Sequence, residues 1–396
     1  MLRESFNGEV FFSSVMKALV LGCGKIGPVA AKDLAESMGS IEVVVADKDG
    51  EKAEKVSEEI GRDNVSWVQL DILNSRESVN ALKDYDLVLG FLPGSIGYHL
   101  VKTCVDAGKD LVDVSFMSEN PLGLNDEALK ANVTVIPDCG LAPGISNVLV
   151  GHAVEKLDRV QHVHIMVGGL PEEPVPPLGY VITWSPESLI DEYTRKARIV
   201  RKGEIVEVEA LSDLEPVDFP DVGRLEAFYT DGLRTLLYTI RNVEDMWEKT
   251  LRYPGHAEKV MLLKDLGFFD EKPVSVDGLN VPPRKLTAKL FEQKLWKPKV
   301  KDIVVLKVEV SGFRNNERIR YVYHLLDRYD EKNGITAMAR TTAYPASIIA
   351  QLMLKKAVEE KGVLPPEKIG MKDELFTAFL SELEKRGIYV KEEIVA

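Results

Sequence analysis

Three glycines near the N-terminus have the spacing of a phosphate-binding turn. Gly22, Gly24 and Gly27 follow a short apolar segment, and a helical pattern begins after them. In such a unit the first glycine permits the tight turn, the second lets the backbone approach a pyrophosphate, and the third lets the helix pack on its strand. The free N–H groups at the start of that helix attract phosphate. The pattern therefore predicts a dinucleotide site, with Lys25 and Ile26 inside the turn.

An acidic residue follows the next apolar segment. Asp47 comes directly after the segment 41–46 and lies 20 residues beyond Gly27. A carboxylate at this position accepts hydrogen bonds from the ribose hydroxyls of NAD and repels the additional phosphate of NADP. We therefore predict NAD as the cofactor, although the adjacent Lys48 weakens that preference. The alternative is a domain of the same fold that binds no dinucleotide, or a different nucleotide.

Strand and helix patterns alternate through the N-terminal third of the chain. This alternation predicts an α/β fold of the Rossmann type, a doubly wound parallel sheet with right-handed crossovers. The strands are expected at 17–22, 41–46, 65–70, 86–91, 110–115 and 133–137, and the helices at 25–38, 50–60, 75–83, 95–107 and 123–131. Ligands of such sheets bind at the carboxyl ends of the strands. Further cofactor contacts are therefore predicted where strands stop, at Asp71, Ile72, Leu92, Pro93, Val114 and Ser115.

Asp113 ends one of these strands, on the side where the nicotinamide ring of the cofactor would lie. A carboxylate there can attract a substrate ammonium and accept its proton, so Asp113 is a candidate general base. The alternative is that Asp113 caps the following segment and orders its loop.

The pattern changes after residues 143–144, where a helix at 145–157 precedes longer strands. These are expected at 162–169, 197–200, 205–211, 246–253, 302–313 and 318–329, with a hairpin turn at 315–316. They predict a second, α+β domain with a mostly antiparallel sheet, for substrate binding and oligomerisation. The expected organisation is an N-terminal extension (1–15), a dinucleotide-binding domain (16–145) with a returning helix at about 341–361, a second domain (146–340), and a C-terminal helical tail (362–396).

The composition argues against several other classes of protein. The net charge is −13 and no basic stripe stands out, so no nucleic-acid partner is expected. No apolar run has the length of a transmembrane helix, so no membrane association is expected. The three cysteines lack the spacing of a disulfide framework or a zinc site, which predicts a cytoplasmic protein without a metal. His162 and His164 alternate on one predicted strand face, which favours a structural role. The many Glu–Lys pairs are typical of thermophilic surfaces and also of ordinary solvated helices.

Several segments together resemble the saccharopine dehydrogenase/reductase family, and within it the lysine 6-dehydrogenases. The resemblance covers residues 16 to about 361. It is carried by the glycine turn and by residues 112–115 (VDVS), 139–147 (CGLAPGISN), 183–186 (TWSP), 252–256 (RYPGH) and 262–267 (LLKDLG). It implies NAD-dependent oxidative deamination of the ε-amino group of L-lysine. The product is 2-aminoadipate 6-semialdehyde, which cyclises to piperideine-6-carboxylate, and ammonia is released. The resemblance also implies a homodimer.

The same resemblance points to substrate-side residues. Arg252 matches the Arg-Tyr-x-Gly segment and is the candidate partner of the substrate carboxylate, or else part of an interdomain salt bridge. His256 follows at a helix start and is a candidate proton donor or relay, or a capping residue. Trp184 and Tyr180 can wall the aliphatic lysine chain or belong to the core, and Ser185 lies in the same matched segment.

Two other functions stay open. The first is a saccharopine-type or carboxynorspermidine-type NAD(P)-dependent enzyme. Saccharopine carries three carboxylates, so its pocket should contain more than one arginine, and Arg195, Arg198 and Arg234 are available. The second is a non-catalytic NAD-binding sensor, which would keep the glycine turn and lose the substrate-side charges. The presence of Asp113 and Arg252 argues against a sensor.

Overall fold

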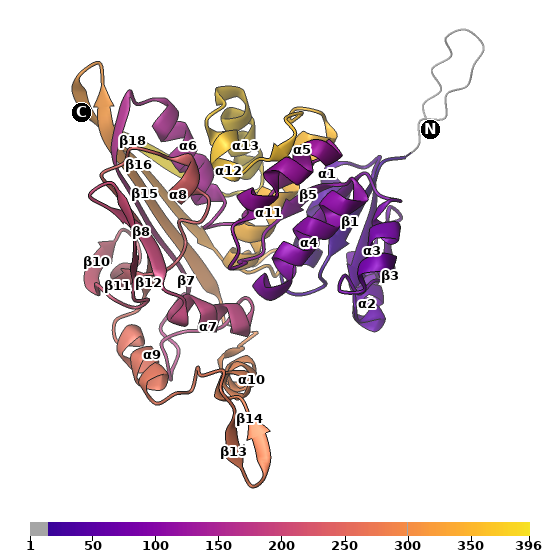
Figure 1. The fold of residues 1–396 in the computed structure, drawn as a ribbon, viewed down its shortest axis with the longest axis horizontal. Coiled ribbons are helices and arrows are strands. Elements are labelled where there is room, and N and C mark those ends of the chain that lie inside the picture. The colour runs from indigo at the N-terminus through magenta and orange to yellow at the C-terminus, as the bar shows by residue number, and fades with distance from the viewer. Residues whose placement is uncertain (1–14, 299) are drawn as a thin grey trace.

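The computed structural model describes residues 15–298 and 300–396, and in these residues the chain forms two large sheets (Figure 1). The predicted N-terminal extension lies outside the described residues, except for Val15. The first sheet comprises β1 (Lys17–Leu21), β2 (Glu42–Asp47), β3 (Val65–Gln69), β4 (Leu87–Gly90), β5 (Asp110–Asp113), β6 (Thr134–Ile136) and β17 (Gly362–Val363). Its order is β17-β6-β5-β4-β1-β2-β3, and every pairing is parallel.

Both faces of the parallel sheet are covered, because alternate side chains of each strand enter different cores. In β1, Ala18 and Val20 pack toward the helices α1 (Gly27–Ser37), α2 (Gly50–Ile60) and α11 (Ala337–Leu354). Leu19 and Leu21 pack on the opposite face, toward α3 (Ser75–Leu82), α4 (Gly94–Ala107), the short η1 (Pro121–Leu124) and α5 (Asn125–Ala131). Helices on both faces make the sheet doubly wound, as the alternation predicts.

The second sheet is mostly antiparallel, which confirms the predicted fold class. It comprises β7 (Arg159–Pro171), β8 (Ala197–Arg201), β9 (Glu204–Val208), β10 (Glu215–Phe219), β11 (Gly223–Tyr229), β12 (Asp245–Arg252), β15 (Asp302–Arg314), β16 (Glu317–Arg328) and β18 (Val390–Val395). The main order is β10-β11-β12-β7-β15-β16-β18, with β8 and β9 attached beside β12. Strands β7 and β12 run parallel.

Some helices pack on the second sheet, and others form a core of their own. Helix α6 (Ile145–Glu155) packs on β7 and β15, and α8 (Leu236–Thr239) follows a buried loop. Helices α7 (Pro186–Thr194), α9 (His256–Asp265) and α10 (Pro283–Leu295) share a separate core, and the hairpin β13 (Val274–Val276) and β14 (Leu279–Val281) projects beyond them (Figure 1).

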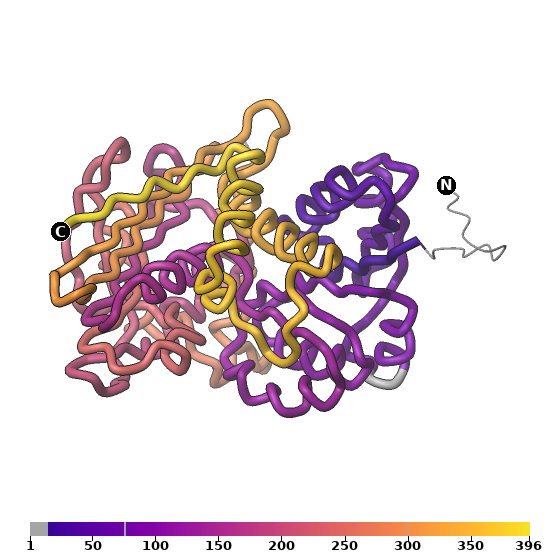
Figure 2. The backbone as a smooth tube through the Cα atoms, turned by 90° about the horizontal axis from the view of Figure 1, so that it is seen from above, coloured from indigo at the N-terminus to yellow at the C-terminus, as the bar shows by residue number. Residues whose placement is uncertain are grey.

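The C-terminal segment links the two sheets (Figure 2). Helix α11 begins and ends earlier than the predicted helix. It begins at Ala337 because Thr336 caps it and the Asp302 carboxylate accepts the N–H groups of Ala337 and Met338. The tail contains α12 (Pro366–Gly370) and α13 (Asp373–Lys385), but it is not purely helical, since β17 joins the first sheet and β18 the second. Strand β18 is an exposed, charged edge strand, so it lacks the apolar alternation that would have predicted it.

Candidate dinucleotide and substrate site

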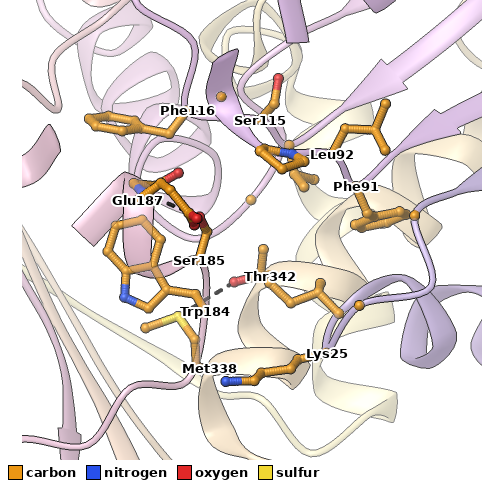
Figure 3. Close-up of a pocket in the computed structure, with 18 of the residues that line it drawn as sticks. Lys25, Phe91, Leu92, Ser115, Phe116, Trp184, Ser185, Glu187, Met338 and Thr342 are labelled. Atoms are coloured by element: carbon orange, nitrogen blue, oxygen red, sulfur yellow. Dashed lines mark hydrogen bonds between the residues drawn. The ribbon is translucent and has the colours of Figure 1, made fainter. Parts of the chain in front are cut away.

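A cavity of about 590 Å³ runs from the carboxyl ends of the parallel strands to the second sheet. One end is lined by the glycine turn and the ends of β2 and β4, and the other by β12, α7 and the segment before α7. Figure 3 shows the middle of this cavity, with Phe91 and Leu92 from the first sheet on one side and Trp184 and Phe116 on the other. We call the two parts the nucleotide end and the substrate end.

The backbone builds the nucleotide end. Gly22 has a φ of 106°, and Gly27 packs so tightly that a Cβ there would overlap the carbonyl oxygen of Gly22. Gly27 therefore supports the turn from behind, while Gly24 faces open space, as a phosphate-binding position requires. The other predicted cofactor residues all line the cavity: Gly22, Gly24, Lys25, Ile26, Asp47, Lys48, Asp71, Ile72, Leu92, Pro93, Val114 and Ser115.

Asp47 lies at the carboxyl end of β2, beside the glycine turn. Its Oδ2 accepts the N–H of Cys23 at 2.9 Å, and its Oδ1 accepts the N–H of Asp49 at 3.1 Å. The Lys52 ammonium lies 3.6 Å from Oδ2 and also lines the cavity. A carboxylate held in this way is oriented for hydrogen bonds from a ribose, with two lysines, Lys48 and Lys52, close by.

Lys25 reaches from the glycine turn to residues that follow the first six parallel strands in the chain. Its ammonium donates to the carbonyl oxygen of Ile182 at 3.3 Å and lies 3.6 Å from the centre of the Trp296 ring. Burial lowers the pKa of Lys25 to about 8. Lys25 therefore ties the nucleotide end to the wall of the substrate end.

The substrate end is built by charged and hydroxyl side chains of one buried strand. Glu248, Thr250 and Arg252 are two residues apart on β12, so their side chains share a face, and all three line the cavity. All three are buried. A buried strand with a polar or charged side chain at every second position is unusual and indicates a binding site.

Glu192 on α7 forms an ion pair with Arg252 inside the cavity wall. One terminal guanidinium nitrogen lies 2.9 Å and 3.1 Å from the two carboxylate oxygens, and the Thr250 hydroxyl donates to Glu192 at 2.7 Å. The guanidinium lies 4.8 Å from the centre of the Tyr180 ring. Burial lowers the pKa of Arg252, but the Glu192 charge outweighs this effect and raises it above its usual value. Arg252 is therefore a permanently charged part of the wall.

Glu248 is the second carboxylate of the substrate end. Its Oε1 accepts a hydrogen bond from Thr230 at 3.0 Å, and a Cβ at position 232 would overlap its carboxylate, so Gly232 makes room for it. Burial, together with the nearby charge of Glu192, raises the pKa of Glu248 to about 8. Glu248 can therefore exchange a proton near neutral to mildly alkaline pH.

The predicted aromatic and hydroxyl residues also line the cavity. The Trp184 indole donates to the Tyr180 hydroxyl at 3.0 Å, which holds both rings in place. Ser185 caps α7 by accepting the N–H of Ser188 at 3.3 Å, and its hydroxyl donates to Glu187 (Figure 3). The rings thus form an apolar wall beside the charged strand.

The structure does not place Asp113 in the cavity. Its side chain is fully buried, and one oxygen accepts the backbone N–H and the hydroxyl of Ser115. A Cβ at position 90 would overlap the other oxygen, so Gly90 provides the space that Asp113 occupies. Burial raises its pKa to about 7. Asp113 therefore positions Ser115, as the loop-ordering alternative predicts, and does not line the cavity.

His256 also lies outside the cavity lining. It is the first residue of α9, and its two ring nitrogens are engaged by the Tyr193 hydroxyl and the Leu178 carbonyl, each at 2.9 Å. Burial, with the charge of Arg252, lowers its pKa to about 3. A neutral imidazole with both ring nitrogens hydrogen-bonded behind the wall favours a structural role for His256 over a catalytic one.

Sequence reasoning missed Glu192, Glu248, Thr230 and Thr250. The available signal was the polar alternation of residues 248, 250 and 252 within an otherwise strand-like segment. Glu192 and Thr230 had no such signal, because long-range folding brings them to β12.

The doubly wound sheet, the glycine turn and the charged pocket that faces it define an NAD(P)-binding oxidoreductase. No helix in the described part of the chain is long and apolar enough to cross a membrane.

Comparison with known proteins identifies the family. Residues 18–136 match the saccharopine dehydrogenase NADP binding domain, and residues 140–388 match the saccharopine dehydrogenase C-terminal domain. The chain therefore belongs to the saccharopine dehydrogenase family.

Relatives match along most of the chain. Saccharopine dehydrogenase [NADP(+), L-glutamate-forming] of Saccharomyces cerevisiae is 25% identical over 453 residues, which cover 96% of this chain and 99% of the relative. Alpha-aminoadipic semialdehyde synthase of Arabidopsis thaliana is also 25% identical, over 95% of this chain but only 44% of the relative, so the chain spans less than half of that protein. Carboxyaminopropylagmatine dehydrogenase of Synechocystis is 21% identical over 93% of this chain and 96% of the relative.

A solved structure shows the same fold. Apo saccharopine dehydrogenase (L-Glu forming) from Saccharomyces cerevisiae superimposes with a TM-score of 0.76 and 22% identity, over 96% of this chain and all of that chain.

Proposed function

We propose that the protein catalyses the NAD-dependent oxidative deamination of the ε-amino group of L-lysine to 2-aminoadipate 6-semialdehyde, with release of ammonia. The observation that carries this proposal is the charge of the substrate end. Two buried acidic side chains, Glu192 and Glu248, and one buried guanidinium, Arg252, line it, and the exposed Glu187 adds a further carboxylate. L-Lysine carries two ammonium groups and one carboxylate, so its charges are complementary to these side chains once Glu248 is ionised.

Saccharopine fits this charge pattern less well. It carries three carboxylates, whereas Arg252 is the one arginine that lines the cavity among the described residues. The three other candidate arginines point elsewhere. Arg198 pairs with Asp231, Arg234 with the buried Asp138, and Arg195 donates to the Met117 carbonyl.

The names of the relatives favour a second candidate, a saccharopine-type or carboxynorspermidine-type NAD(P)-dependent enzyme. A non-catalytic sensor is a weaker candidate, because a sensor would not need two carboxylates and an arginine buried beside the dinucleotide site.

The chemistry assigns distinct tasks to these residues. NAD held at the nucleotide end would supply the hydride acceptor for the carbon that bears the reacting nitrogen, and water would then hydrolyse the resulting imine to the aldehyde and ammonia. Before this transfer the ε-ammonium must lose a proton, and Glu248, with a pKa of about 8, can accept it. Arg252 faces the substrate carboxylate, and the rings of Tyr180 and Trp184 cover the aliphatic chain and exclude water from it.

The cofactor preference rests on Asp47. Its oriented carboxylate supports NAD, whereas the yeast relative is named for NADP, and the cavity-lining Lys48 and Lys52 weaken the repulsion of a 2′-phosphate. We therefore propose NAD as the preferred cofactor, with measurable use of NADP.

A product assay tests the proposed reaction. The purified protein with NAD⁺ and L-lysine should form NADH and ammonium in equal amounts, together with a product that reacts with aldehyde reagents. NADH formation from saccharopine, with L-glutamate as product and no ammonium from lysine, would instead establish the second candidate. Bound dinucleotide without turnover of either compound would establish the sensor. The homodimer, the thermophilic source and the cytoplasmic location stay predictions, and light scattering of the purified protein tests the first.

A further inference from the structure

Three potential metal ligands converge on the second sheet, apart from the cavity. They are His162 and His164 of β7 and Asp245 of β12, and none of them lines the cavity. One donor atom from each residue lies within 4.8 Å of the other two. All three side chains are partly exposed, so the group is open to solvent ions.

The sheet register brings these ligands together. His162 and His164 are two residues apart on one strand, so both side chains point to the same face. Asp245 is directly opposite His162 on the parallel neighbour β12, and its side chain therefore projects from that face beside them. The pairing of two central strands, β7 and β12, therefore sets the positions of the three ligands.

Neighbouring groups hold the ligands in this geometry. The Nε2–H of His164 donates a hydrogen bond to the Oδ2 of Asp245 at 3.1 Å. A metal ion that replaced this proton would meet the two atoms close to the separation of about 3.3 Å between two ligands of a tetrahedral zinc ion. The indole of Trp247 stacks on the His164 ring, with centroids 4.2 Å apart and planes 15° from parallel. The rings of His162 and His164 lie 5.8 Å apart. The contacts with Asp245 and Trp247 thus fix the orientation of the His164 ring.

We propose that His162, His164 and Asp245 form a binding site for a divalent transition-metal ion, with Zn²⁺ as the best fit. Two imidazoles and a carboxylate are ligands that zinc accepts, and three protein ligands leave a fourth position for water. A bound ion links β7 to β12 and therefore stabilises the folded state. This site is independent of the cofactor and of the substrate.

Titration with metal salts tests the site. Tag-free protein, freed of metal by a chelator and dialysed, is titrated with ZnCl₂ by calorimetry and with CoCl₂ by visible absorption. We expect one equivalent of Zn²⁺ to bind per chain, and the Co²⁺ complex to show the intense visible bands of a tetrahedral site. Co²⁺ should also quench the fluorescence of the adjacent Trp247, and this part of the quenching should vanish in Trp247→Phe.

Variants assign the binding to these three residues. His162→Ala, His164→Gln and Asp245→Asn should each weaken Zn²⁺ binding by at least about tenfold. His324→Ala is the matched control, because His324 lies on the same face of the sheet but outside the cluster, as its pairing with Lys307 and that of Lys307 with Met166 show. Circular dichroism and thermal unfolding of each variant in the absence of metal establish that it is folded. Wild-type affinity and stoichiometry in a folded His162→Ala/His164→Gln double variant, or no binding to the wild-type protein, would overturn the proposal.

Discussion

The two ends of the cavity are built on different principles. The nucleotide end consists largely of backbone from one short stretch of chain, the turn of Gly22 to Gly27, and of one oriented carboxylate, Asp47. The substrate end consists of buried charged side chains, and its ion pair joins Glu192 to Arg252, 60 residues apart in sequence. The comparison indicates that a diphosphate can be recognised by local geometry, whereas the substrate is recognised by charges that only the complete fold brings together.

The largest effect is expected where the substrate end depends on an internal ion pair. Glu192→Gln leaves Arg252 buried without its carboxylate partner, so the free energy of unfolding should fall by about 3 kcal/mol. Lysine turnover, as kcat/KM, should fall by at least about a hundredfold. Chemical denaturation and steady-state kinetics measure the two effects.

Glu187→Gln is the matched control, since Glu187 lies on the same helix and lines the same cavity without contacting Arg252. If both variants behaved alike, the ion pair would have no special role. NAD binding by folded Glu192→Gln should stay at the wild-type level, because the nucleotide end is built separately.

Glu248→Gln tests the proton acceptor. Lysine kcat should fall by about a hundredfold, the typical contribution of a general base. The wild-type rate should increase with pH through a pKa near 8, and the variant should lose this increase. A variant that retained the wild-type pH profile would exclude Glu248 as the base.

Glu248→Gln should lower activity, but it should raise the stability of the folded protein at high pH. The pKa of Glu248 is raised in the folded protein, so the folded state holds this proton more tightly than the unfolded state does, and stability is lost as pH rises from the ordinary carboxyl pKa to about 8. Glutamine does not titrate. The Tm of Glu248→Gln should therefore exceed that of the wild type by about 2 °C at pH 9, and the difference should shrink at pH 5. A lower Tm for the variant at both pH values would contradict the burial of an ionisable carboxylate.

Asp47→Ala tests the nucleotide end. The Kd for NAD should rise by about tenfold, because hydrogen bonds to a charged group are lost, while the Kd for NADP should change less. Fluorescence titration with both dinucleotides measures this. Asp49→Ala serves as the control, since it removes only the capping bond at the start of α2. Equal losses for NAD and NADP in Asp47→Ala would disprove the contact with the ribose.

The smallest effect is expected for Asp113→Asn. Asparagine can still accept the hydrogen bonds from Ser115, so lysine kcat should fall by less than about tenfold, well below the loss expected for a catalytic base. A fall in kcat of a hundredfold or more would indicate that Asp113 takes part in the proton transfer.

Local patterns predicted strands β1 to β6 of the first sheet, and most of the predicted cofactor residues line the cavity, because a glycine turn and strand ends are properties of contiguous residues. They did not predict β17, which lies in the tail expected to be helical. The same reasoning placed Asp113 and His256 at the reaction centre, whereas neither side chain lines the cavity. Strand ends and helix starts are correct places to look for functional groups, but the direction of a side chain depends on its neighbours, here the space beside Gly90 and the hydroxyl of Tyr193. The tail strand β18 and the carboxylates of Glu192 and Glu248 depend on distant partners, so no local pattern specified them.

The central claim is that the charges of the substrate end select L-lysine. The most direct test is the ratio of kcat/KM for L-lysine to that for saccharopine, measured with NAD⁺ on the wild-type protein. We predict a ratio above about ten, which corresponds to 1.4 kcal/mol of differential transition-state binding. A ratio below one would show that the pocket accepts the more anionic substrate and would contradict the account.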